Sequence, residues 1–497
     1  MRVLGSVRLF YREIGISTKR WKLAAKMSSL PTSPAPLPRL ALDPDVENHI
    51  KQTYCNSQVV ASIGQEEAER RFHCTIEHLS LPPGYTTLRV NTVNRTRDVI
   101  REELQQLIKK EYSNKAAPCP PVEPHPVLPD VLLIPTTGPH LNLQHHSKEI
   151  MVDIPCGAAI LRGAHIFAPG VLGATADVQA GDKVSVYVDV AGKCLRGFQK
   201  PYDGPRVFVG NGVARMSRDD IFSVAQEELS GIGVEMASPL YDCPPLNDVM
   251  PDSIFLQNLP STVAGHVLNP KPGDRVLDMC AAPGGKTTHL ATLMSNQGIV
   301  IALDKSQGKV DKVIANAGRL GLTCVQAYMF DGGKAASDTA LCEKDEKSLG
   351  APPYPPNTFD RVLVDAPCSA LGQRPALGNK MKLKTLKSYP VYQRRLFPAA
   401  VQLLKTGGSL VYSTCTLTLE ENEGQVEWLL NTFPCLELQP QTPYLGGPGL
   451  PGTSLTLDQL LMLQRFEPWG ENRGENSHPS DRDTIGFFIA KFVKEAR

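Results

Sequence analysis

Hydrophobic and polar positions follow three patterns along the chain, and each change of pattern marks a boundary. From Asp43 to Lys110, apolar residues recur at helical spacing around one strand-like run, Thr86–Val93. From Val131 to about Pro239, short β-type runs alternate with glycine turns. From Asn247 to Arg497, strand-like and helix-like segments alternate. We therefore predict an N-terminal helical and α/β region, a small β-barrel and a doubly wound α/β domain.

The C-terminal pattern is the most regular. Short apolar runs, most of them ending in an acid, predict the strands Val276–Asp278, Ile299–Asp304, Cys324–Asp331, Arg361–Asp365 and Ser409–Ser413. Helical spacing between them predicts the helices Lys286–Met294, Gly308–Leu320 and Val391–Leu404. This order builds a sheet whose ligand crevice lies at the carboxyl ends of the strands. A late apolar run, Asp483–Val493, predicts a further strand at the sheet edge.

The earlier regions give shorter elements. The N-terminal region predicts a helix capped near Asp45 and further helices at Ile63–His78 and Arg97–Lys110, followed by a Pro-rich loop, Ala116–Pro129. Runs that begin at Val131, Ile150, His165, Val184 and Val207 predict the barrel strands. The expected division is 1–42 as a basic extension and linker, 43–146 as an N-terminal α/β region, 147–241 as the barrel and 242–497 as the doubly wound domain.

Composition narrows the class of protein. The 497 residues are 41% hydrophobic and 21% charged, and no apolar run approaches eighteen residues, so we expect a globular protein without a membrane span. A net charge of +1 does not decide for or against nucleic acid. The twelve cysteines include no C-x-x-C pair, which argues against a zinc ribbon and a disulfide scaffold. We expect a reducing intracellular compartment and no metal.

Residues 1–26 carry seven Lys or Arg against one acid, Glu13, with apolar residues between them. This composition suits a mitochondrial presequence, and the alternative is an upstream extension with Met27 as the usual start. We expect a cytoplasmic protein, and a mitochondrial one if residues 1–26 act as a presequence. Residues Pro31–Pro38 form a Pro- and Ser-rich linker.

The stretch Val276–Lys286 predicts a strand, a turn of small residues and a helix start. The turn leaves room for a ligand to approach the backbone, and the helix offers free N–H groups; its residues are Cys280, Ala281, Ala282, Pro283, Gly284 and Gly285. A nucleotide-like ligand fits. A P-loop is the alternative, because Gly285-Lys286-Thr287 ends like one, but it requires glycine where Cys280 stands. Asp304 lies 26 residues beyond Asp278, near the spacing of an acid that binds ribose, and Asp331 ends the next strand.

Two cysteines follow adjacent predicted strands, Cys368 after the fourth and Cys415 after the fifth. A lone buried cysteine is usually a small hydrophobe, but a pair over the ligand crevice suggests chemistry. The C5 atom of cytosine becomes nucleophilic only after a thiolate adds at C6, and a second thiol or an ordered water can assist the later elimination. Asp365 would hold N3 and the exocyclic amine of the base.

The barrel region resembles the PUA domain of RNA-modifying enzymes. The resemblance rests on 161–170 (LRGAHIFAPG), on Ala180–Val184 and on Val209–Gly212. It implies a domain that holds the end of an RNA stem and its single-stranded tail, through contacts at Arg162, Gly163 and His165. Residues 193–218 carry six basic residues and one acid, which suits a basic rim as well as a solvated face.

Three motifs carry a wider resemblance, namely CAAPGGK (280–286), DAPCS (365–369) and STCT (413–416). With the PUA-like insertion, nearly all of 27–497 resembles the Nop/Sun RNA (cytosine-5)-methyltransferases, a family of Rossmann-like class I enzymes. The resemblance implies S-adenosylmethionine held by 280–286, Asp304, Asp331 and Asp365. It also implies Cys415 as nucleophile, Cys368 as release cysteine and Lys286 reaching the base.

The implied substrate is a cytosine near the 3′ end of a tRNA acceptor stem, flipped out for attack, with the CCA tail on the PUA domain and mRNA hairpins as secondary targets. No obligate protein partner is expected. Two positions depart from the family pattern, because Ala370 stands where glycine is common and Ala376 where asparagine is. Either change could alter RNA fit or rate.

The segment that follows, Arg374–Arg395, carries seven basic residues and no acid. Its place beside the nucleophile favours phosphate binding, with the predicted contacts Arg374, Lys380, Lys382, Lys384 and Lys387. Three hypotheses stand: an active RNA methyltransferase, a catalytically weak RNA-binding protein, and a P-loop NTPase whose Walker B strand would be Val362–Asp365. The paired cysteines favour the first.

Overall fold

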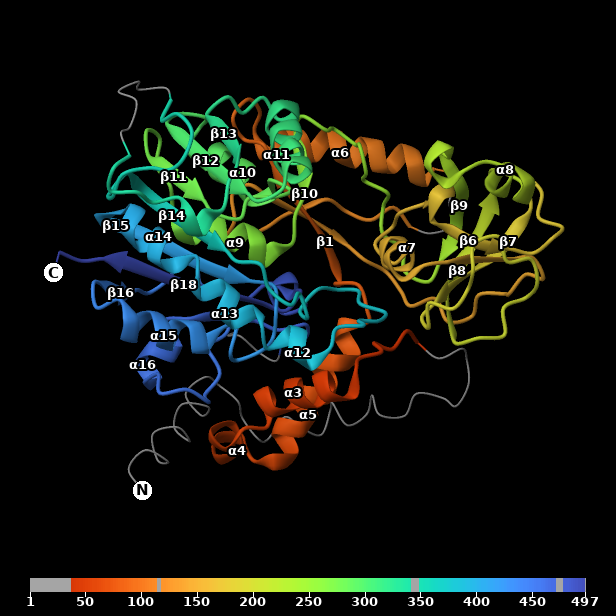
Figure 1. Cartoon of the computed structure of the whole chain (residues 1–497). Helices are drawn as coiled ribbons and strands as arrows, with labels where there is room; N and C mark the ends of the chain where they lie inside the picture. The colour runs from red at the N-terminus through yellow and green to blue at the C-terminus, as the bar shows by residue number, and fades with distance from the viewer. Residues whose placement is uncertain (1–36, 114–117, 341–347, 471–476, 497) are drawn as a thin grey trace.

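The computed structural model describes residues 37–113, 118–340, 348–470 and 477–496 (Figure 1). The predicted extension at 1–26 and the linker at 31–38 fall outside it, apart from the last two linker residues. The chain folds into an N-terminal part, a barrel-like part and the doubly wound domain, and the barrel-like part lies at the opposite side of the molecule from the C-terminal strands (Figure 1). Within the described helices, none has both the length and the apolar composition to cross a membrane.

The C-terminal domain contains an eight-stranded sheet. Its strands are β11 (Arg275–Asp278), β12 (Ile299–Asp304), β13 (Val325–Met329), β14 (Phe359–Asp365), β15 (Leu404–Thr414), β16 (Leu436–Leu438), β17 (Gln464–Phe466) and β18 (Phe487–Lys494). The order is β13-β12-β11-β14-β15-β18-β16, and β17 pairs with β18 outside this path. The first five strands in this order are parallel to one another. The predicted doubly wound fold is therefore confirmed, and the carboxyl ends of β11 to β15 meet at one edge.

The prediction that Asp483–Val493 forms an edge strand is wrong. Strand β18 lies antiparallel to β15 on one side, and β16 and β17 pair with its other side. Residues Phe487–Ala490 are fully buried, because the strand has a paired neighbour on each side and a packed layer on each face. An apolar run of this kind fits an interior strand better than an edge.

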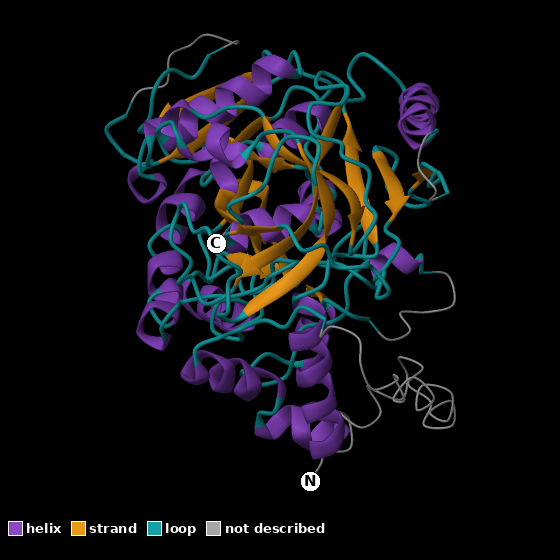
Figure 2. Cartoon of the chain, turned by 90° about the vertical axis from the view of Figure 1, so that its right-hand side faces the viewer, coloured by secondary structure: helices purple, strands orange, loops and turns teal. Residues whose placement is uncertain are grey.

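Helices cover both faces of this sheet (Figure 2). They are α9 (Leu259–Leu268), α10 (Gly285–Leu293), α11 (Gln307–Arg319), α13 (Tyr389–Arg394), α14 (Phe397–Leu403), α15 (Glu423–Thr432) and α16 (Leu457–Leu461). The short helix α12 (Leu383–Leu386) packs against the N-terminal helix α3 (Pro44–Tyr54) instead. Alternate residues of β15 enter different cores: Val411 packs with α9 and α10, and Tyr412 packs with α14 and α15. The single helix predicted at Val391–Leu404 is two helices, because Pro398 lies in the first turn of α14, where proline is tolerated.

The N-terminal part combines helices with a small sheet. It contains α3 (Pro44–Tyr54), α4 (Ser57–Ile63), α5 (Gln65–Leu79), β1 (Tyr85–Val90), α6 (Arg97–Tyr112), β2 (Glu123–Pro124), β3 (Val131–Pro135) and β10 (Ile254–Leu256). The sheet order is β10-β1-β3-β2. Strand β3 was expected to open the barrel, but it pairs with β1. Strand β10 lies beyond the barrel in sequence and also pairs with β1. The barrel is therefore an insertion within this N-terminal unit.

The inserted part has six strands of its own. They are β4 (Glu149–Val152), β5 (Ile166–Phe167), β6 (Val171–Ala174), β7 (Lys183–Asp189), β8 (Arg206–Ala214) and β9 (Ile232–Pro239), joined by α7 (Ile154–Ile160) and α8 (Arg218–Phe222). The order is β5-β9-β8-β7-β4-β6, with β4 and β7 parallel. Gly210 has φ +135, and a Cβ there would lie 2.5 Å from Pro239 Cα, so the close β8–β9 crossing requires glycine. Its identity as a PUA domain stays a prediction.

Buried polar groups join the N-terminal sheet to the C-terminal domain. Arg89 of β1 is fully buried and donates to Thr288 of α10 over 2.8 Å. Asp130 accepts from the Nε2 atoms of His266 (2.7 Å) and His289 (2.8 Å), which belong to α9 and α10. Gly265 is required here, because a Cβ would lie 2.3 Å from the His289 ring. The helix that starts at the small-residue turn is thus anchored to the N-terminal part.

Candidate active site

The small-residue turn follows β11 as predicted and is folded around a buried carboxyl. Asp278 is 1% exposed, and it accepts from Thr287 Oγ1 (2.7 Å) and from the Cys280 N–H (3.4 Å). Burial raises the pKa of Asp278 to about 7. Gly284 caps α10 at φ +103 and packs against α11, where a Cβ would lie 3.1 Å from Val313 Cα. The positive φ and this close approach favour glycine at position 284, and the small side chains of the other turn residues leave the backbone open to a ligand.

Two acids mark the carboxyl ends of the next strands. Asp304 ends β12, and Lys309 lies 3.8 Å from its carboxylate. Asp331 follows β13 and caps the short helix η4 (Gly332–Lys334) by accepting from the Gly333 N–H over 3.1 Å. Because β12 and β13 are parallel neighbours, both carboxylates lie on the edge of the sheet that carries the turn.

Asp365 ends β14 and joins α10 to β15 through its two carboxylate oxygens. Its Oδ2 accepts from Lys286 Nζ over 2.7 Å, and its Oδ1 accepts from Ser413 Oγ of β15 over 2.7 Å. Lys286 is the second residue of α10. The ring of Phe487 of β18 lies against its ammonium group, with 5.1 Å from Nζ to the ring centre. Lys286 therefore points toward Asp365, which is not the phosphate-cradling role of a P-loop lysine.

The two predicted cysteines meet in the crevice. Cys368 Sγ and Cys415 Sγ lie 3.4 Å apart, and both residues are partly exposed. The hydrogen bond from Cys368 lowers the pKa of Cys415, with a further contribution from Gln373 and Lys286, while burial opposes it. For Cys368, the hydrogen bond to Cys415 is the largest cause of a raised pKa, and burial is the second. The pair is therefore asymmetric, with the negative charge favoured on Cys415.

Backbone contacts close the cysteine loops. The Gly372 N–H donates to the Cys415 carbonyl (2.9 Å), and the Gly486 N–H donates to the Gly372 carbonyl (2.8 Å). A Cβ at Gly372 would lie 2.1 Å from the Gly486 oxygen, so this crossing requires glycine. Ala370, where the family commonly has glycine, has φ +56 and thus occupies the left-handed region.

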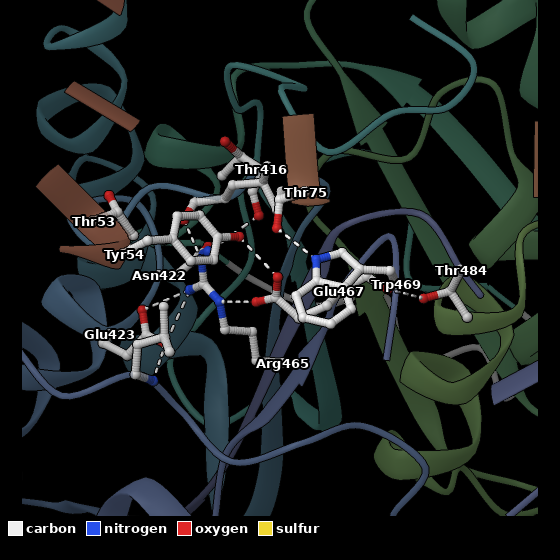
Figure 3. Close-up of polar contacts among 12 residues, drawn as sticks. Thr53, Tyr54, Thr75, Thr416, Asn422, Glu423, Arg465, Glu467, Trp469 and Thr484 are labelled. Atoms are coloured by element: carbon white, nitrogen blue, oxygen red, sulfur yellow. Dashed lines mark hydrogen bonds and ion pairs between the residues drawn. The ribbon is translucent and has the colours of Figure 1, made fainter. Parts of the chain in front are cut away.

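A buried charge network supports the Cys415 loop from behind (Figure 3). Arg465 of β17 is 2% exposed and contacts both Glu423 oxygens at 3.1 Å and Glu467 at 2.8 Å. Its Nη2 donates to the carbonyl of Leu417, two residues beyond Cys415. Tyr54 of α3 donates to Glu467 over 2.8 Å, so the N-terminal helices share the network.

The prediction that Arg374 binds phosphate is wrong. Its side chain is 3% exposed, pairs with Asp483 and donates to the carbonyls of His78, Leu81, Pro82, Pro468 and Thr484. A guanidinium saturated in this way by protein acceptors has no donor for RNA. A charge count cannot reveal this, because a buried arginine and a surface arginine look alike in sequence.

The other predicted RNA contacts remain accessible in part. Lys380, Lys382, Lys384 and Lys387 are exposed, although Lys382 also pairs with Asp43 over 2.6 Å. Among the barrel contacts, Arg162 is exposed and His165 Nδ1 accepts from the Met236 N–H over 3.1 Å.

Gly163 has a structural requirement, because it has φ +91 and a Cβ would lie 2.5 Å from the Cys243 carbonyl. No role was predicted for Ser413, which binds Asp365, nor for Gln393 and Glu421, which bind the loop that carries Cys368. The acids that directly follow STCT in 417–423 (LTLEENE) were the available signal.

The doubly wound fold and the residues at its strand ends, together with the matches below, define a Rossmann-like class I methyltransferase that uses S-adenosylmethionine. The model of the family described as 16S rRNA methyltransferase RsmB/F matches residues 265–493. A tRNA (cytosine(72)-C(5))-methyltransferase, NSUN6, of Mus musculus is 49% identical over 474 residues, covering 92% of this chain and 97% of its own. The NSUN6 of Homo sapiens is 48% identical over 92% and 98%.

Among solved structures, NSun6 from Pyrococcus horikoshii with SFG is similar, with a TM-score of 0.70 and 30% identity over 92% of this chain and 99% of the other. The chain belongs to the Nop/Sun family of RNA (cytosine-5)-methyltransferases. The family resemblance predicted from the three motifs is confirmed, and the P-loop NTPase hypothesis is wrong.

Proposed function

We propose that the protein methylates C5 of a cytosine near the 3′ end of a tRNA acceptor stem through a covalent cysteine–cytosine intermediate. The observation that carries this proposal is the pair of sulfurs 3.4 Å apart beside the Lys286–Asp365 bridge. The relatives that are 48% and 49% identical over 474 aligned residues carry the name tRNA (cytosine(72)-C(5))-methyltransferase, which supports the choice of tRNA. mRNA hairpins of similar shape are secondary targets in this proposal.

The small-residue turn and the strand-end acids fit S-adenosylmethionine. Residues 280–286 would approach its amino-acid part through the backbone, and Asp304 and Asp331 would accept from hydroxyl and amine groups of the nucleoside. Asp365 would contribute to the same pocket beside its contact with the base. The similar Pyrococcus structure is described with SFG, an analogue of S-adenosylmethionine, which supports this location. When bound, the cofactor supplies an electrophilic methyl group on a sulfonium.

Cys415 is the proposed nucleophile. Its thiolate would add to C6 of the cytosine, which moves electron density to C5 and makes that carbon able to accept a methyl group. Cys368 S–H donates toward Cys415 Sγ, and Lys286 lies on the same side, so the thiolate is stabilised before attack. The thiolate is the reactive form, so this local charge raises its concentration at neutral pH.

Asp365 would hold the base during the addition. Lys286 and Ser413 each bind one of its oxygens, so the carboxylate has a fixed orientation at the end of β14. In that position it would accept from N3–H and the exocyclic amine, which stabilises the charge that develops on the ring.

Cys368 is the proposed release cysteine. After methyl transfer, an ordered water would accept the C5 proton, the electrons of the C5–H bond would re-form the C5–C6 double bond, and the Cys415 sulfur would leave as a thiolate. The S–H of Cys368 can hydrogen-bond to that sulfur as it leaves, because the two sulfurs are already neighbours. Without Cys368, the covalent adduct should persist.

The RNA would lie along the exposed lysines of 380–387 and reach the six-stranded part. The lysines would contact phosphates, and the region of Arg162, Gly163 and His165 would hold the CCA tail. We propose cytoplasmic activity, with mitochondria as the site if residues 1–26 act as a presequence.

A methyl-transfer assay tests the proposal. With radiolabelled S-adenosylmethionine and total tRNA, wild-type protein should place label in 5-methylcytosine, and Cys415→Ala should reduce the rate by at least about 10³-fold, as expected on loss of a covalent nucleophile. Methylation by Cys415→Ala would contradict the assigned roles. A wild type that binds tRNA without transferring label would favour the catalytically weak RNA-binding protein.

A further inference from the structure

Glu421 is a buried carboxylate between the two loops that carry the cysteines, and the mechanism above gives it no role. It lies two residues before α15 and has no exposed surface. Its Oε2 accepts from the Ser369 N–H over 2.9 Å, and its Oε1 accepts from the Ser369 hydroxyl over 2.6 Å. Ser369 directly follows Cys368, so both carboxylate oxygens hold the Cys368 loop.

The same carboxylate holds the Cys415 loop. Oε1 accepts from Thr418 Oγ1 over 3.0 Å and from Thr416 Oγ1 over 3.4 Å. Thr416 directly follows Cys415, and its hydroxyl lies 2.6 Å from the Ser369 hydroxyl. The residues after the two cysteines therefore meet on one oxygen of one side chain.

A third element joins this cluster. Gln393 of α13 is fully buried, and its Nε2 donates to Glu421 Oε2 and to the Pro367 carbonyl, both over 3.1 Å. Tyr412 of β15 donates its hydroxyl to the backbone carbonyl of Glu421 over 2.5 Å. Glu421 is thus fixed by donors from the sheet and a helix while it fixes both loops.

We propose that Glu421 is a positioning residue for the methyl transfer, which keeps the two sulfurs in contact with the proton on Cys368 and the negative charge on Cys415. The inference rests on the proposed function of the two cysteines. The hydrogen bonds of Glu421 are unequal between the two loops, because both of its oxygens bind Ser369, next to Cys368, whereas only Oε1 binds the residues that follow Cys415.

The charges that face the pair support this arrangement. The Cys368 side faces Glu421, whose negative charge adds to the effects of the Cys415 contact and of burial in raising the Cys368 pKa. The Cys415 side faces Lys286, Asp365 and Gln373, of which Lys286 and Gln373 lower its pKa and Asp365 raises it. Removing the charge of Glu421 should therefore release the proton of Cys368 more easily and make the two thiols more alike.

Thiol alkylation tests the proposal without RNA. Wild-type protein, Glu421→Gln, Ser369→Ala and Glu420→Gln are treated with iodoacetamide across pH 5.5 to 9.5, and mass spectrometry follows each cysteine separately. In Glu421→Gln, Cys368 alkylation at pH 7 should rise about tenfold, which equals one pKa unit, and the preference for Cys415 should shrink. Ser369→Ala removes one arm of the contact and should shift the ratio in the same direction by about threefold.

Glu420→Gln is the matched control, because Glu420 is the adjacent acid, is about half exposed (51%) and pairs with His49. It should leave both alkylation profiles unchanged. Folding of each variant is checked by thermal unfolding and by S-adenosylmethionine binding. Profiles of folded Glu421→Gln that coincide with the wild type would overturn the proposal; if Glu421→Gln does not fold, an unchanged Ser369→Ala profile would do so.

A second readout connects the charge asymmetry to catalysis. In single-turnover methylation of total tRNA, Glu421→Gln should slow the reaction about tenfold with unchanged affinity for S-adenosylmethionine, and Glu420→Gln should match the wild type. A wild type that transfers no methyl group would refute the proposed function, whereas the alkylation profiles would still decide the role of Glu421.

Discussion

Ala370 has a backbone conformation that lowers the stability of the loop that carries Cys368. It lies two residues beyond Cys368 with φ +56, where an L-residue other than glycine costs about 1 kcal/mol. We expect Ala370→Gly to raise the free energy of unfolding by about 0.5 kcal/mol, since glycine also loses more chain entropy. Urea unfolding measures this. Ala376→Gly is the control, because Ala376 lacks a positive φ and the change should destabilise; equal effects of both changes would contradict the account.

We expect Arg374 to contribute to the stability of the folded protein and not to RNA binding. Replacing it with alanine leaves the Asp483 partner and several carbonyls without their donor, and we expect a loss of about 3 kcal/mol in the free energy of unfolding. Lys384→Gln should leave stability within about 0.5 kcal/mol and reduce the salt dependence of tRNA binding by about one counterion. Filter binding at several salt concentrations and chemical denaturation distinguish the two. Weak RNA binding by a stable Arg374→Ala would contradict this assignment.

At the residue scale, the sequence predicted the reactive side chains but not the buried residues that hold them in position. Cys368, Cys415, Asp365 and Lys286 could be placed, because strand ends of a parallel sheet bring such residues to one edge. Glu421 could not, because nothing in an acidic run indicates which carboxylate is buried. That depends on contacts between loops that are distant in sequence.

At the element scale, the contact of Asp130 with two histidines joins the N-terminal sheet to α9 and α10. Burial lowers the pKa of His289 to about 4 from its usual 6.5, although Asp130 opposes this. The unfolded chain then binds a proton that the folded chain does not, so stability is complete above pH 6.5 and falls as the pH is lowered toward 4.

We expect the free energy of unfolding to fall by about 2 kcal/mol from pH 6.5 to pH 5 through this group. His289→Gln, which retains a donor for Asp130, should flatten that slope. Urea unfolding at a series of pH values measures it, and His266→Gln provides a comparison at the less buried histidine. An identical slope in His289→Gln and the wild type would contradict the assignment.

The sequence predicted the elements with a strong hydrophobic periodicity. It did not predict strand pairings between segments that are far apart in the chain. The strands β11 to β15 and the helices α10 and α11 agree with their predicted positions within a few residues, except that β15 starts five residues earlier. The interior position of β18 and the pairing of β10 with β1 were not predictable, because both depend on partners far away in sequence. Local pattern carries no information about such partners.

At the scale of the whole molecule, the inserted six-stranded part is tied to the segment beside the active site. Leu377 packs in the core of the inserted part, and Thr137 and Asp242 pair where the chain leaves and returns. The segment that carries the predicted RNA-binding lysines therefore touches both parts.

We expect a variant without the inserted part to bind S-adenosylmethionine but to methylate tRNA more slowly. Replacing residues 139–240 with a short Gly-Ser linker joins positions that are already neighbours, and S-adenosylmethionine binding should persist because the turn and the strand ends lie elsewhere. Methylation of tRNA below saturation should fall at least tenfold. Calorimetry and the radiolabel assay measure these quantities, and unchanged methylation would contradict an RNA-holding role for the insertion.

In the mechanism proposed above, Cys415 attacks the cytosine and Cys368 assists its release. The most direct measurement is mass spectrometric mapping of the covalent RNA adduct formed by Cys368→Ala with tRNA and S-adenosylmethionine. We expect a methylated cytosine nucleotide attached to the peptide that contains Cys415, and no adduct in the Cys368→Ala, Cys415→Ala double variant. An adduct on any other residue, or methyl transfer by Cys415→Ala, would contradict it.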